Sequence, residues 1–75
     1  MKKIDSEAVK KAAEIVGGKQ KLAEIVGVAY KTILDWTSGR SGITVGNALK
    51  IERATNSKIT AKEILPSFPW DELKQ

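Results

Sequence analysis

The chain has 75 residues, enough for one small domain, and 13 Lys and Arg residues against 9 Asp and Glu residues give it a net charge of +4. This charge favours a polyanionic partner. The absence of His and Cys excludes disulfides and removes the usual ligands of zinc and haem, and the acidic residues are too scattered for a calcium loop. We therefore expect no metal and no cofactor.

The sequence has no apolar run approaching the roughly 20 residues that a membrane helix needs, and Lys2 and Lys3 are not followed by the apolar core of a signal peptide. We therefore expect a cytoplasmic protein with no membrane partner. An enzyme without His or Cys is left with carboxylate or lysine pairs for acid–base chemistry. No two carboxylates here have a spacing that suggests one pocket, so we expect that the protein is not an enzyme.

The first predicted helix covers residues 6–16. Asp5 is a favourable N-cap, and Ile4 and Val9 have the spacing of a hydrophobic staple. Gly17 is the expected left-handed residue after the helix. Lys10 and its neighbours lie on the opposite side from the apolar stripe, which consists of Val9, Ala12, Ala13 and Val16.

Two short helices follow, joined by a tight turn at Gly27. The first begins at Lys19 or Gln20, and the second runs from Ala29 or Tyr30 to residue 38. Gly27 allows the positive φ that a tight corner needs. Two crossed helices joined in this way are typical of a helix-turn-helix, here at about residues 19–38. Their inward-facing residues are predicted to be Leu22, Ala23, Val26, Ile33 and Trp36.

A fourth helix is predicted after a loop at residues 39–42. Thr44 is a plausible N-cap, and the helix carries the apolar residues Val45, Ala48, Leu49, Ile51 and Ala54. Gly46 in its first turn lowers the local helix propensity and would permit close approach of another backbone. Asn56 tolerates the left-handed conformation that ends the helix.

A short fifth helix is predicted over residues 61–65, where Thr60 and Glu63 have the spacing of a capping box and Pro66 ends the helix. Residues 1–66 then form one all-α domain of five short helices, and residues 67–75 form a C-terminal tail. Phe68 and Trp70 in this tail are our candidates for a dimer contact, and the alternative is that they fold back on their own core.

The second helix of the helix-turn-helix offers a chemically varied outer face. A helix of this kind can enter the major groove of duplex DNA, where its N-terminal residues reach base edges. Lys31 can donate to guanine, and Leu34 or Tyr30 can pack against a thymine methyl group. Asp35 can accept from cytosine, or it can form an i,i+4 ion pair with Lys31.

The edges of the same motif offer candidate phosphate contacts. The start of the first motif helix combines free backbone N–H groups with Lys19, Gln20 and Lys21. The alternative is that these residues form an ordinary solvated surface. The remaining phosphate candidates are Thr32, Arg40 and Ser41.

These residues resemble a known family. Leu22-Ala23, Gly27-Val28, Ile33 and Trp36 resemble the helix-turn-helix of lambda-repressor-like domains, in particular small Cro-type phage repressors. The wider sequence is similar to the YdaS-type Cro/CI-like antitoxin group over about residues 16–72, in the segments GGKQKLAEIVGV, ILDWTSGR, ALKIERAT and SFPWDE.

The resemblance implies an all-α five-helix domain that binds palindromic operators in double-stranded DNA as a homodimer. It places Tyr30, Lys31, Leu34 and Asp35 at base-contacting positions. Lys19 matches a phosphate-contacting position that is usually Gln. Ala29 departs from the family, because a capping Ser or Thr usually stands there.

Two functions remain in competition. The first is a transcriptional repressor of a phage or prophage that occludes its operator in a bacterial host cell. The second is an antitoxin-like interaction module whose main partner is a toxin and whose DNA binding is secondary.

Overall fold

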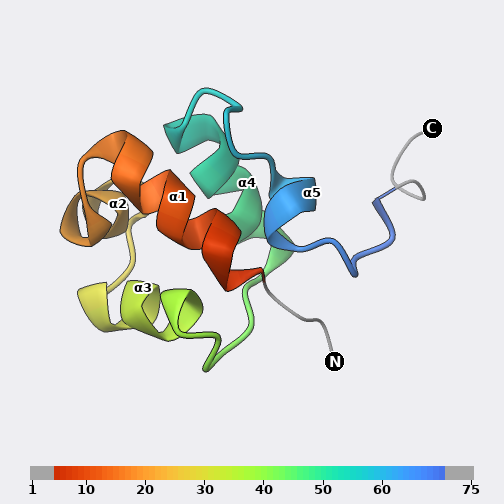
Figure 1. Ribbon diagram of the computed structural model, residues 1–75, viewed down its shortest axis with the longest axis horizontal. Helices are drawn as coiled ribbons and strands as arrows, with labels where there is room; N and C mark the ends of the chain where they lie inside the picture. Colours follow the sequence, from red (N-terminus) through yellow and green to blue (C-terminus); the bar gives the residue numbers. More distant parts are fainter. Residues whose placement is uncertain (1–4, 71–75) are drawn as a thin grey trace.

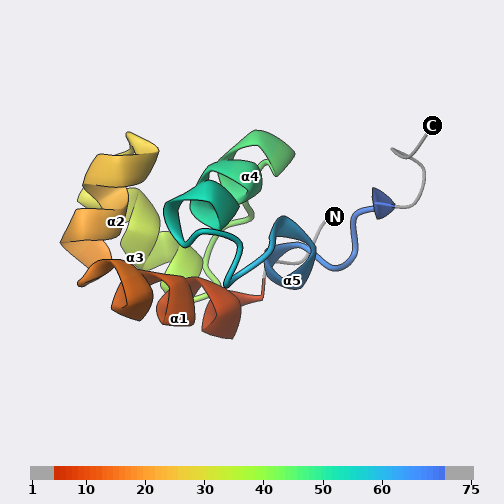
Figure 2. The ribbon, with the colours of Figure 1, turned by 90° about the horizontal axis from the view of Figure 1, so that it is seen from above.

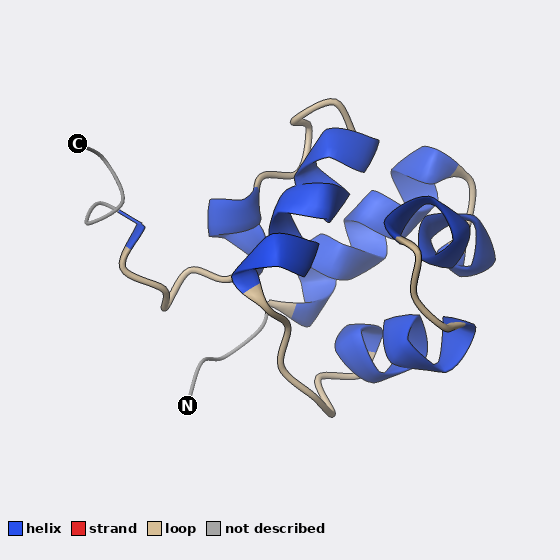
Figure 3. Ribbon diagram, turned by 180° about the vertical axis from the view of Figure 1, so that it is seen from behind, coloured by secondary structure: helices blue, strands red, loops and turns tan. Residues whose placement is uncertain are grey.

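Five α-helices form the described part of the chain, residues 5–70, in the computed structural model (Figure 1). No strand occurs within these residues, so the predicted all-α fold is confirmed (Figure 3). The fifth helix ends one residue earlier than predicted because Leu65, just before Pro66, has left the helical conformation. The helices are α1 Ser6–Val16, α2 Lys19–Val26, α3 Tyr30–Thr37, α4 Val45–Ala54 and α5 Ala61–Ile64.

The first helix, α1, holds the other four together, because it contacts each of them. Figure 2 shows α1 along one side of the domain, with α2 at one end and α5 at the other. The contacts of α2 with both α3 and α4 complete the packing around the centre. The helix-turn-helix pair therefore rests on a scaffold made by α1 and α4.

The core takes at least one residue from every helix. Trp36 is only 2% exposed, which confirms its predicted place in the core. Leu49, one of the apolar residues of α4, is 41% exposed and does not belong to the core. The largest fully buried hydrophobic side chains are Val9, Leu22, Ile33, Ile51, Ile64 and Leu65.

Three of the helices begin at the side-chain caps that the sequence predicts. The Asp5 carboxylate accepts from the N–H groups of Glu7 and Ala8 at 3.1 and 3.3 Å. The Thr44 hydroxyl accepts from the first turn of α4, and Thr60 forms the complete capping box of α5. The predicted staple involves Ile4, which lies outside the described residues. These caps satisfy donors that a helix start leaves unpaired.

The C-terminal half is also held by a longer-range polar contact. The Glu52 carboxylate on α4 accepts from the backbone N–H of Ala61, the first residue of α5, at 2.7 Å. The buried Thr55 hydroxyl accepts from the N–H of Ile59 at 3.1 Å. Together these bonds fix the turn between α4 and α5. None of the helices in residues 5–70 has the length and apolar character needed to cross a membrane.

Two of the glycines that the sequence singles out, Gly27 and Gly46, behave differently. Gly27 has φ +84°, the left-handed conformation predicted for the corner between α2 and α3. Gly46 was expected to allow a close backbone approach, and this is wrong: no atom lies within 4 Å of the position that its Cβ would occupy. The conformation therefore requires glycine at position 27, whereas nothing in the packing requires it at position 46.

We predict that Gly27→Ala lowers the free energy of unfolding by about 1–2 kcal/mol, because an L-residue is strained in the left-handed region. The space around Gly27 is open, so no steric clash adds to this cost. The matched control Gly46→Ala, inside a helix, should be neutral or stabilising by up to about 1 kcal/mol. Urea denaturation of the three proteins measures the difference. Equal stability of Gly27→Ala and the wild type would contradict the prediction.

Candidate nucleic-acid interface

The turn between α2 and α3 is fixed by backbone hydrogen bonds and by burial. The N–H groups of Gly27 and Val28 both donate to the Ala23 carbonyl, at 2.8 and 3.1 Å. Ala23 itself is buried between the helices, and Val28 packs against the core. This arrangement sets the start of α3 at Tyr30 and the angle at which α3 leaves the turn.

The inner face of α3 is anchored by Ile33, Trp36 and Thr37, all of them buried. The Trp36 indole N–H donates to the Gly42 carbonyl at 3.1 Å, so the loop after α3 is tied to the helix. The N–H of Arg40 in this loop donates to the Asp35 carbonyl at 2.9 Å. One set of contacts thus fixes both the rotation of α3 and the path of the loop that follows it.

The outer face of α3 carries the four predicted base-contacting residues. Tyr30 and Leu34 are 48% and 37% exposed. The Lys31 side chain is 81% exposed, and that of Asp35 is 23% exposed. Their ammonium and carboxylate groups lie 3.4 Å apart, as the i,i+4 spacing predicts. A pair of this kind contributes only about 0.3–0.5 kcal/mol to stability.

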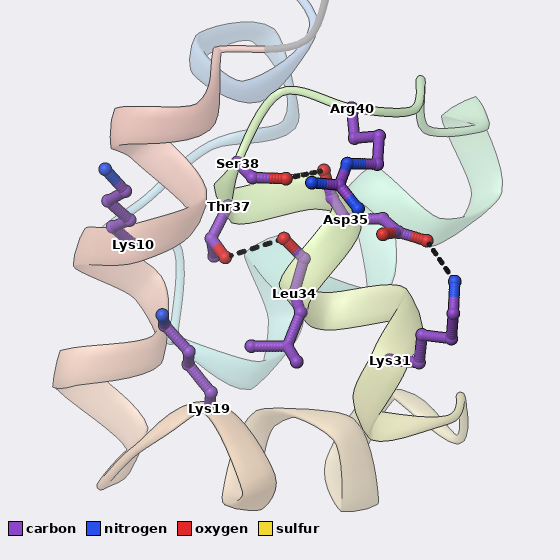
Figure 4. Close-up of a pocket in the computed structure, with 8 residues that line it drawn as sticks. All are labelled: Lys10, Lys19, Lys31, Leu34, Asp35, Thr37, Ser38 and Arg40. Atoms are coloured by element: carbon purple, nitrogen blue, oxygen red, sulfur yellow. Dashed lines mark hydrogen bonds and ion pairs between the residues drawn. The ribbon is translucent and has the colours of Figure 1, made fainter.

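A basic depression of about 530 Å³ lies where α1, α2 and α3 meet (Figure 4). Four cations and one carboxylate line it, and that carboxylate is paired with Lys31. Figure 4 shows Leu34 near its middle, with Lys10 and Lys19 on one side and Lys31 and Arg40 on the other. The lining residues are Lys10, Lys19, Lys31, Leu34, Asp35, Thr37, Ser38 and Arg40.

The depression gathers only part of the predicted interface. Lys19, Leu34 and Arg40 meet there with the Lys31–Asp35 pair. The other predicted residues lie outside its lining: Tyr30 and Thr32 on α3, Gln20 and Lys21 on α2, and Ser41 in the loop. Of these, Thr32 is half-buried and the rest are exposed.

Sequence reasoning missed three of the lining residues: Lys10, Thr37 and Ser38. The Thr37 and Ser38 hydroxyls donate to the carbonyls of Leu34 and Asp35 at 3.1 and 3.2 Å, which closes the end of α3. The helical periodicity of α1 correctly places Lys10 on the polar side of the helix. That periodicity does not indicate that the polar side of α1 borders α2 and α3.

The two helices of the motif lack the side-chain caps found on α1, α4 and α5. Gly18 precedes α2 and Ala29 precedes α3, and neither start has a side-chain hydrogen bond. The departure at Ala29 therefore leaves α3 uncapped, although the helix still begins at Tyr30. Uncapped N-termini present backbone donors and a partial positive charge to an anion.

Two short crossed helices on a compact α-helical scaffold define this protein as a small helix-turn-helix domain. More specifically, the chain belongs to the family described as "Bacterial toxin YdaS", which matches residues 9–73. It is 29% identical over 75 residues to the Escherichia coli K12 protein named "Putative transcriptional regulator YdaS", covering 100% of this chain and 76% of that protein.

A second relative comes from a bacteriophage. The chain is 28% identical over 57 residues to the "Regulatory protein cro" of Pseudomonas phage D3, which covers 76% of this chain and 78% of that protein. No solved structure matches the chain significantly. Both relatives are regulatory proteins by name.

Proposed function

We propose that the protein is a transcriptional regulator that binds double-stranded DNA in a sequence-specific manner and represses by occluding its operator. The observation that carries this proposal is the exposed outer face of α3 beside a basic depression. The names of the relatives, a transcriptional regulator and a Cro protein, support the same class. The net charge of +4 fits a polyanionic partner.

In the proposed complex, α3 lies in the major groove and its outer face meets base edges. Lys31 is highly exposed and donates to guanine O6 and N7, while Leu34 and Tyr30 offer apolar contact to a thymine methyl group. Asp35 either accepts from cytosine N4 or orients the Lys31 ammonium, to which it is already bonded.

Phosphate contacts are proposed at the borders of this face. Lys19, Gln20 and Lys21 stand at the uncapped start of α2, where backbone N–H groups can bind a phosphate oxygen. Arg40 and Ser41 are exposed in the loop after α3, and Thr32 is the remaining candidate. Contacts of this type fix the register on the duplex without reading its sequence.

We further propose that the protein acts as a homodimer on a palindromic site, with two copies of α3 about 34 Å apart, or one duplex turn.

The packing of the tail favours the fold-back alternative for its aromatic residues. The Trp70 indole N–H donates to the Leu65 carbonyl at 2.7 Å, and the Phe68 and Trp70 rings make an edge contact at 4.8 Å. Both residues pack against the core of their own chain.

An antitoxin-like interaction module is the second candidate. The family is described as a bacterial toxin, and this description favours a function that depends on a protein partner as well as on DNA. A toxin that co-purifies with the protein and competes with DNA for it would support this function. If DNA neither displaces that toxin nor is displaced by it, the two functions use separate surfaces.

Selection of preferred sites from random duplex DNA tests the leading function directly. We expect enrichment of a two-fold symmetric sequence whose half-sites are about 10 base pairs apart, because one duplex turn separates the reading helices. Recovery of unselected, random sequence would contradict a sequence-specific regulator.

Two lysine substitutions separate the proposed roles of base and phosphate contacts. We predict that Lys31→Ala loses about 1–3 kcal/mol of preference for the selected site over a scrambled duplex. The matched change Lys19→Ala should weaken both duplexes similarly and reduce the salt slope by about 1. Fluorescence anisotropy at several salt concentrations measures both effects. Equal behaviour of the two variants would contradict this division of roles.

We predict that Trp70→Ala lowers the free energy of unfolding by about 2 kcal/mol, less than truncation of a fully buried Trp, because the ring is only partly buried. Its sedimentation mass at micromolar concentration should equal that of the wild type. The control Tyr30→Ala removes an exposed ring and should change stability by less than about 0.5 kcal/mol. A lower mass for Trp70→Ala would instead place the tail in a dimer interface.

A further inference from the structure

Lys10 belongs to neither helix of the helix-turn-helix, yet it borders the same basic depression. It lies on α1, which contacts both α2 and α3. Lys10 and Lys19 lie along the same side of the depression, one on α1 and the other at the start of α2 (Figure 4). A polyanion bound at the start of α2 would therefore pass close to Lys10.

The ammonium group of Lys10 has a partner that is easily exchanged. It lies 3.4 Å from the Glu7 carboxylate one turn earlier on α1, and the two side chains are 45% and 71% exposed. Exposed pairs of this kind are weak and are screened by salt. Hydrogen bonds between an ammonium group and a phosphate are charge-assisted and strong. The flexible lysine stem allows the group to turn from one anion to the other.

The other charges around the depression also favour an anion there. Asp35 is the one carboxylate among its lining residues, and it is paired with Lys31 on the far side. Within residues 5–70, neither Lys19 nor Arg40 forms an ion pair. Each DNA strand carries one negative charge per about 3.4 Å of helix axis, so a strand that reaches Lys19 brings neighbouring phosphates with it.

We propose that Lys10 contacts a DNA phosphate from α1, and that Glu7 holds its ammonium group in the free protein. Binding exchanges the Glu7 carboxylate for the phosphate. The protein surface that tracks the DNA backbone thus extends beyond the two motif helices onto α1. This inference rests on the proposed function, since it assumes that the bound polyanion is duplex DNA.

The test uses Lys10→Met and a labelled mixed-sequence duplex of about 20 base pairs, because a phosphate contact does not require the operator. Loss of one contact should reduce the slope of log K against log salt by about 0.9. The ratio of wild-type to variant affinity should then fall about threefold between 50 and 200 mM salt. Equal slopes for the two proteins would overturn the proposal.

Lys11→Met is the matched control, because it makes the same charge change at the next position of α1. Lys11 lines a different depression with Ile59 and Pro66, on the side of α5. The Lys11→Met variant should keep the wild-type slope of log K against log salt. An equal reduction of the slope in both variants would mean that only net charge matters, and it would overturn the proposal. Failure of the wild type to bind duplex at low salt would overturn the proposed function and this inference together.

A second variant tests the part played by Glu7. Glu7→Gln frees the Lys10 ammonium group and should tighten binding to the same duplex by about twofold, a size in keeping with a weak exposed pair. In the Lys10→Met background this gain should disappear. A gain of the same size in both backgrounds would show that Glu7 acts through its own charge alone, which would overturn its assigned role. Thermal melts of all variants check that each is folded.

Discussion

The proposed interface depends on the way Trp36 is buried and hydrogen-bonded. Its ring occupies the core, and its only polar atom is satisfied by the Gly42 carbonyl at 3.1 Å. A buried indole N–H without such a partner would be costly, so the loop after α3 must return to this position. The same contact thus turns Leu34 outward and keeps Arg40 beside α3.

The helices of the scaffold and the helices of the proposed interface differ in how their N-termini are capped. The three helices outside the motif begin at oxygen-bearing side chains, Asp5, Thr44 and Thr60, which satisfy their first N–H groups. The two motif helices begin after Gly18 and Ala29, which bring no such oxygen. The missing cap costs about 1 kcal/mol of stability at Ala29 and roughly a few tenths of a kcal/mol at Gly18. In the proposed complex, a phosphate oxygen binds the uncovered donors at the start of α2.

Local signals in the sequence predicted most of this fold, and contacts between distant segments account for what they missed. Helix ends follow from caps within three residues, as at Thr60, and from a left-handed glycine such as Gly27. The hydrogen bond from the Ala61 N–H to the Glu52 carboxylate joins residues nine apart in the chain, so no helical spacing predicts it. Lys10 likewise borders the depression because α1 crosses α2 and α3, and periodicity does not determine such crossings.

In the proposed interface, the paired charges on α3 contribute to specificity and the other cations around them contribute to affinity. At the middle of the α3 face, Lys31 and Asp35 neutralise one another beside Leu34. In the proposed complex, this part has little net attraction for phosphate, so its contribution depends on matching base edges. The lysines at the start of α2 and the loop arginine have no carboxylate partner within residues 5–70, and in the proposed complex they attract any duplex. Under the proposed function, a change in the central residues therefore alters which site is chosen, with little change in the attraction that brings the protein to DNA.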